Sequence, residues 1–129
     1  MEYRVTLTET SKELTVKEKI QMKDTTSAQS LDQLTLEAQQ TGDRVIIDVD
    51  FWCKLEIYNE KSDDKNYVNF IVVDKDAKKY ITGSNSFITS FLNMATEMLE
   101  AGEDDFKIEV YRVQSKNYKG KDFITCSIL

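Results

Sequence analysis

The chain has 129 residues, of which 40% are hydrophobic and 31% charged, a size and balance typical of one globular domain. It contains no apolar run long enough for a membrane span and no visible signal peptide, so we expect a cytoplasmic protein with no membrane partner. Histidine is absent and the only cysteines are Cys53 and Cys126, which predicts two buried, unpaired thiols and no metal or other cofactor.

The formal net charge of −6 argues against nucleic-acid binding when it is considered alone, but the charges are unevenly distributed. Residues 84–105 include five acidic side chains and no basic one, whereas residues 106–129 include five basic and two acidic side chains. We therefore expect an electrically polarised molecule with a basic C-terminal end.

The first 43 residues are predicted to form an extension that packs on the rest of a single domain covering residues 1–129. Apolar residues alternate with polar ones in 3–7 and again in 14–22, which predicts two N-terminal strands. Residues 30–39 then carry apolar side chains at helical spacing, which predicts a short helix with Ser30 as its N-cap, although a strand would also suit Leu34 and Leu36.

The stretch from Arg44 to Tyr58 has an apolar residue at every odd position, which predicts a long strand with one buried face. The strongest helix signal of the chain begins after Ser84 and stops at Gly102. Four further strands are predicted, at residues 67–74, 80–83, 106–113 and 122–129.

The order of elements from residue 44 onward is strand, strand, strand, helix, strand, strand. This is the order of a five-stranded Greek-key barrel of the oligonucleotide-binding (OB) type. We therefore expect a mainly β fold with α: an OB-fold-like barrel over residues 44–129, with one helix between strands three and four and extra N-terminal strands. Because strands and helices do not alternate, a parallel Rossmann-like sheet is disfavoured.

Aromatic and basic side chains lie on the predicted outward faces of these strands and in the final hairpin loop. Single-stranded nucleic acid requires cations for its phosphates and flat rings for its bases, and such barrels bind it across the second and third strands and the neighbouring loops. The predicted nucleic-acid-binding residues are Arg44, Trp52, Lys54, Tyr58, Tyr67, Tyr111, Arg112, Lys116, Tyr118, Lys119, Lys121 and Phe123.

Several of these residues also suit other roles. Trp52 suits core or rim packing equally well, and a lysine-rich hairpin tip also serves solubility and edge protection. Asp48 and Asp50 lie on one strand face and suit a magnesium ion for phosphodiester cleavage, but no further acidic cluster accompanies them. The chain has four glycines and no phosphate-cradling motif, so we expect no enzyme and no catalytic residue.

Three phrases resemble the small single-stranded DNA-binding proteins encoded by phages and conjugative elements of Gram-positive bacteria. They are YNEKSDDKNYVNFIVVD at 58–74, YITGSNSFITSF at 80–91 and KDTTSAQSLD at 23–32. The resemblance covers most of the chain. It implies an OB barrel, a homo-oligomer with a dimer favoured, and a coating role on single strands during replication or transfer.

The leading hypothesis is therefore a non-enzymatic, largely sequence-independent single-stranded DNA-binding protein of a mobile element, with RNA left open as a ligand. The alternative is an acidic protein-interaction module, or DNA mimic, that binds a host protein. Its candidate surface consists of Glu97, Glu100, Glu103, Asp104 and Asp105.

Overall fold

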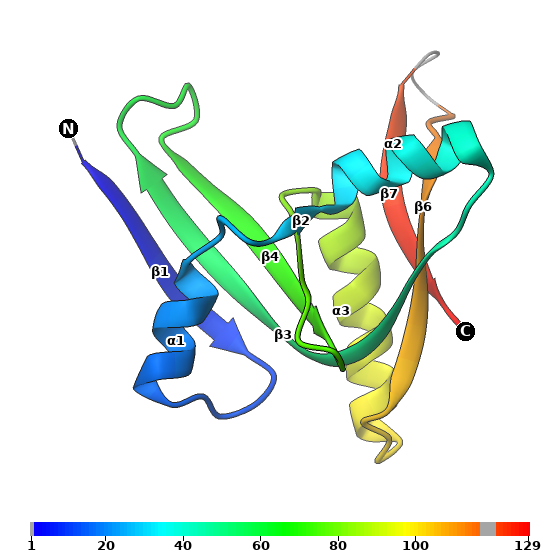
Figure 1. Ribbon diagram of the computed structural model, residues 1–129, viewed down its shortest axis with the longest axis horizontal. Coiled ribbons are helices and arrows are strands. Elements are labelled where there is room, and N and C mark those ends of the chain that lie inside the picture. Colours follow the sequence, from blue (N-terminus) through cyan, green and yellow to red (C-terminus); the bar gives the residue numbers. More distant parts are fainter. Residues whose placement is uncertain (1, 117–120) are drawn as a thin grey trace. The chain divides into compact units, whose positions relative to one another are not determined.

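The computed structural model describes residues 2–116 and 121–129, and its elements follow the predicted order from residue 44 onward (Figure 1). The strands are β1 (Tyr3–Thr10), β2 (Gln29–Ser30), β3 (Val45–Asn59), β4 (Asn66–Asp74), β5 (Lys79–Thr82), β6 (Phe106–Gln114) and β7 (Asp122–Ile128). The helices are α1 (Val16–Lys23), α2 (Leu31–Thr41) and α3 (Asn85–Glu100). Over the described residues the protein is thus mainly β with three helices, which confirms the coarse fold class.

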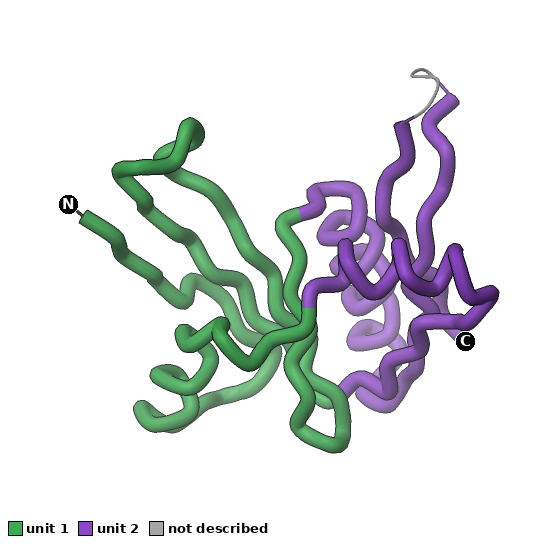
Figure 2. Tube along the Cα trace, turned by 45° about the horizontal axis from the view of Figure 1, so that its top comes forward, with its two compact units in different colours: residues 1–29, 50–83 green, residues 30–49, 84–129 purple. Residues whose placement is uncertain are grey.

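The chain divides into two compact units built from interleaved segments, coloured separately in Figure 2. Unit 1 contains residues 1–29 and 50–83, and unit 2 contains residues 30–49 and 84–129. Strand β3 passes from unit 2 into unit 1 after Val49, so its two parts belong to different units. None of the three boundaries, which follow residues 29, 49 and 83, coincides with the predicted division at residue 43, and the single domain stays a prediction.

Unit 1 is a sheet in which the strands lie in the order β1, β3, β4, β5. Strand β1 pairs antiparallel with β3, with a register irregularity between Leu7 and Glu9, and β4 pairs antiparallel with β5. The odd residues of β3 face a buried apolar cluster that includes Phe51, Cys53 and Leu55. The predicted buried face is therefore confirmed in this part of the strand, and the even residues belong to the opposite face.

The predicted second N-terminal strand is wrong, because Val16–Lys23 form helix α1. The Glu18 backbone N–H donates to Thr15 Oγ1 at 3.1 Å, and the Thr15 backbone N–H donates to Glu18 Oε1 at 3.0 Å. These hydrogen bonds lower the pKa of Glu18. Such a capping box satisfies backbone donors that a helix leaves unpaired at its N-terminus. Met22 is the only buried residue of α1. The alternation of apolar residues over 14–22 therefore does not correspond to the buried face of a strand.

Unit 2 combines the N-terminal part of β3 with β6, β7, α2 and α3. Strand β6 pairs antiparallel with β3 and with β7, and helix α3 lies against β7. Ser86 Oγ donates to the Ile124 carbonyl at 2.7 Å, and Phe87 and Phe91 of α3 are fully buried. The predicted helices and the final hairpin are confirmed, and Ser30 and Ser84 cap α2 and α3.

Both cysteines are unpaired and buried, as the sequence predicts. Burial raises the pKa of the Cys53 thiol to about 11 and that of Cys126 to about 12. Because the thiolate is the reactive form, we expect neither thiol to react with iodoacetamide in the folded protein at mildly alkaline pH. Mass spectrometry should detect two adducts only after unfolding in urea. Rapid labelling of either cysteine in the native protein would contradict this burial.

Candidate nucleic-acid interface

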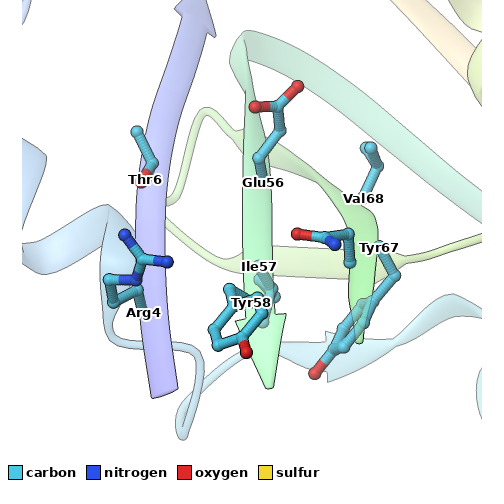
Figure 3. Close-up of a pocket in the computed structure, with 8 residues that line it drawn as sticks. Arg4, Thr6, Glu56, Ile57, Tyr58, Tyr67 and Val68 are labelled. Carbon is cyan, nitrogen blue, oxygen red and sulfur yellow. The ribbon is translucent and has the colours of Figure 1, made fainter. Parts of the chain in front are cut away.

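A surface cavity of about 370 Å³ lies on unit 1, where β1, β3 and β4 run side by side (Figure 3). Its lining residues are Arg4, Thr6, Glu56, Ile57, Tyr58, Asn66, Tyr67 and Val68. We call this cavity the tyrosine pocket. It joins side chains that are far apart in the sequence because antiparallel pairing places Arg4 opposite Tyr58 and Thr6 opposite Glu56.

Arg4 and Tyr58 form the most clearly defined contact in the tyrosine pocket. The Arg4 guanidinium carbon lies 5.0 Å from the centre of the Tyr58 ring, within the range of a cation–π interaction. Arg4 Nε also lies 3.4 Å from Glu2 Oε1, and both of these side chains are well exposed. A surface ion pair of this kind contributes little to stability, so it leaves the guanidinium available to an incoming anion.

Tyr67 brings a second aromatic ring to the same pocket from the start of β4. Both Tyr58 and Tyr67 are half-buried, so each ring is partly fixed by packing and partly open to solvent. In Figure 3 the Tyr58 ring lies between Arg4 and the Tyr67 ring. Two of the predicted site residues therefore meet in one cavity, together with a cation that the sequence reasoning did not select.

Trp52 and Lys54 share the even side of β3 with Tyr58 by strand alternation, and both are half-buried. The Trp52 backbone N–H donates to Ser11 Oγ at 3.0 Å, and its carbonyl accepts from the Ser11 N–H at 2.9 Å. The Lys54 carbonyl accepts from Thr8 Oγ1 at 3.3 Å. The backbone of both residues is thus held by β1 and the segment after it, outside the tyrosine pocket.

Two of the predicted phosphate contacts in unit 2 are engaged within the unit. Arg44 Nη2 donates to Glu109 Oε1 at 2.7 Å, and this ion pair lowers the pKa of the Glu109 carboxyl. Arg112 makes three hydrogen bonds, to Thr35 Oγ1 at 3.0 Å, to the Asp32 carbonyl at 2.9 Å and to Asp122 Oδ1 at 2.9 Å.

Those three bonds connect helix α2 to strands β6 and β7, and the Arg112 side chain is only 10% exposed. A guanidinium in this position acts first as a structural link, because its donors are directed into the fold. We therefore leave Arg44 and Arg112 out of the proposed contact surface.

The remaining predicted residues of unit 2 that the structure describes are Tyr111, Lys116, Lys121 and Phe123. Lys116 and Lys121 are exposed, and Phe123 is 39% exposed at the start of β7. The hydroxyls of Tyr111 and Ser127 lie 2.6 Å apart, a distance at which they share a hydrogen bond. Tyr118 and Lys119 lie outside the described residues. The predicted site residues are thus divided between the two units.

Within residues 2–116 and 121–129, no group of three or more cysteine or carboxylate side chains is placed to hold a metal ion. Asp48 and Asp50, the predicted alternative magnesium ligands, are assigned to different units. In the described part of the chain, none of the helices has the length and apolar character needed to cross a membrane.

Comparison of the chain with protein-family models, with curated proteins and with solved structures found no match. The candidate interface therefore rests on the residues themselves. Its chemistry consists of two tyrosine rings, one guanidinium and one carboxylate around a single cavity.

Proposed function

We propose that the protein binds single-stranded DNA without enzymatic activity and that the tyrosine pocket is its main contact. The observation that carries this proposal is the convergence of Arg4, Tyr58 and Tyr67 from three strands on one cavity. Aromatic faces accept stacked bases of any sequence, and a neighbouring cation neutralises the phosphate that each base brings.

Each unit carries further aromatic and basic residues that suit single-stranded DNA. Trp52 and Lys54 occupy the even positions of β3 that precede Glu56 and Tyr58. In unit 2, the exposed Lys116, Lys121 and Phe123 provide a second set of the same residue types. The regularly spaced phosphates of a DNA strand can contact several such groups. This supports a protein that coats a strand and does not recognise one short site.

The proposal includes an OB-type fold and the biological setting implied by the sequence resemblance. Strand β3 pairs with both β4 and β6, and α3 lies between β5 and β6 in the chain, which supports the Greek-key order of such barrels. We accordingly propose a cytoplasmic protein that self-associates as a dimer or larger oligomer. Its role would be in replication or transfer of a phage or conjugative element.

The direct test is a titration of fluorescein-labelled oligo-dT with the full-length protein at low salt, followed by fluorescence anisotropy. We expect saturable binding at micromolar protein that weakens as salt is raised, because binding to phosphates releases counterions. An unlabelled strand of unrelated sequence should compete. The absence of any anisotropy change at low salt would refute the proposal.

A second candidate function is supported by the exposure of the acidic residues at and after the end of α3. Glu97, Glu100, Glu103, Asp104 and Asp105 are all exposed, as a surface that imitates DNA requires. A pull-down from host lysate after nuclease treatment separates the two functions. A DNA mimic keeps its host partner after nuclease treatment, whereas a protein that coats DNA loses partners held through nucleic acid.

A further inference from the structure

The tyrosine pocket contains a carboxylate, that of Glu56. A site that contacts only phosphates has no use for this negative charge. Glu56 is exposed, lies opposite Thr6 in the β1–β3 pairing and lines the cavity beside Tyr58. Within the described residues, no side chain or backbone group donates a hydrogen bond to its carboxylate. A negative charge at this position repels phosphate, so a site that only coated strands would gain from its absence.

We propose that Glu56 makes the tyrosine pocket selective for guanine, an inference that rests on the proposed binding of single-stranded DNA. An ionised carboxylate has two acceptor oxygens and can accept two parallel N–H donors. Guanine presents such a pair on its Watson–Crick edge, the ring N1–H and the exocyclic amino group. Guanine stacked in the pocket with this edge toward Glu56 therefore offsets the repulsion between the carboxylate and the strand.

The other three bases cannot supply this pair of donors. Adenine and cytosine each present one amino group next to a ring nitrogen that is itself an acceptor, so one carboxylate oxygen would face a lone pair. Thymine presents one ring N–H between two carbonyl acceptors. Each of these bases donates fewer hydrogen bonds to the two Glu56 oxygens than guanine does, so each is bound less tightly beside the carboxylate.

The spacing of the pocket residues fits this assignment. Glu56 and Tyr58 are two residues apart on β3 and share one face, so their Cα atoms lie roughly 7 Å apart. In Figure 3 the Glu56 carboxylate extends away from the Tyr58 ring, so the edge of a base stacked on that ring is reached when the exposed Glu56 side chain rotates toward it. Figure 3 shows both side chains on β3, with Arg4 on one side of Tyr58 and Tyr67 on the other. Arg4 is available to the phosphate of the same nucleotide.

The experiment compares two labelled strands by anisotropy, one of thymines only and one in which single guanines alternate with thymines. We expect the wild-type protein to bind the guanine-containing strand at least about tenfold more tightly, as for one bidentate base contact. Glu56→Ala should abolish this preference and bind oligo-dT at least as tightly as wild type. Alanine is used because a glutamine amide could still accept from the guanine N1–H and donate to O6. Glu13→Ala, the same change at an exposed position before α1, should leave both affinities unchanged.

The outcomes separate this inference from the proposed function. Equal wild-type binding of both strands, or a guanine preference that survives in Glu56→Ala, would overturn the role of Glu56 and leave the proposed function standing. Failure to bind either strand would overturn the proposed function. A parallel titration with dGMP and dCMP distinguishes the source of the guanine. One further outcome is that dGMP binds, whereas dCMP and both strands do not. The pocket then recognises a free guanine nucleotide, which supports the inference and overturns the proposed function.

Discussion

Replacement of Arg112 by alanine is expected to lower the free energy of unfolding by about 2 to 3 kcal/mol. The reason is that one side chain, only 10% exposed, donates to Thr35 Oγ1, to the Asp32 carbonyl and to the Asp122 carboxylate. Its removal leaves the buried Thr35 hydroxyl without this donor, leaves the Asp122 carboxylate without its cation and removes these links between α2 and β6. Urea denaturation followed by circular dichroism measures the change.

Arg112→Lys is the matched control for charge, since it keeps the cation but cannot direct three donors in the plane of a guanidinium. We expect it to recover only part of the lost stability. Arg44→Ala removes a more exposed ion pair with Glu109 and should cost less. If Arg112→Ala is as stable as wild type and instead weakens oligo-dT binding, Arg112 is a phosphate contact and its structural assignment is wrong.

Replacement of Tyr58 by alanine is expected to weaken oligo-dT binding about 5- to 150-fold, because a base stacked on an aromatic ring contributes about 1 to 3 kcal/mol. The variant also loses the ring that holds the Arg4 guanidinium, so the cation becomes less ordered. The measurement is the dissociation constant from anisotropy at fixed low salt.

Two tyrosine variants control this prediction. Tyr58→Phe keeps the ring and should bind oligo-dT nearly as tightly as wild type, since stacking does not need the hydroxyl. Tyr3→Ala removes a ring that is 56% exposed on β1 but does not line the tyrosine pocket, and should have little effect. Equal affinity of Tyr58→Ala and wild type would show that the bases stack elsewhere.

The elements that could be predicted from the sequence are those whose signal is local. The alternation over residues 44–58 predicts β3 almost to the residue, and Ser30 and Ser84 mark the starts of α2 and α3. Helix α1 was missed because alternation outweighed the Thr15 and Glu18 capping box, a sequence signal of helix initiation. Glu18 also interrupts the alternation of the predicted strand, and this interruption is a sequence signal against a strand at this position.

The candidate site was less predictable because its composition depends on pairings between distant segments. Arg4 joins Tyr58 only through the pairing of β1 with β3, and nothing near Arg4 in the sequence indicates that strand partner. For the same reason, the sequence predicts Arg44 and Arg112 as nucleic-acid contacts, since their partners Glu109 and Thr35 are not their sequence neighbours. Sequence patterning identifies the residue types of a binding surface, whereas strand pairing decides which of them are available to bind.

The central claim is that single-stranded DNA lies along the even side of β3 in unit 1. Trp52 is the only tryptophan of the chain and is half-buried on that side, so its fluorescence reports directly on this path. We predict that oligo-dT changes Trp52 emission in proportion to the binding seen by anisotropy, and that both signals are lost together as salt is raised. Saturable binding by anisotropy without any change in Trp52 emission would contradict this placement of the strand.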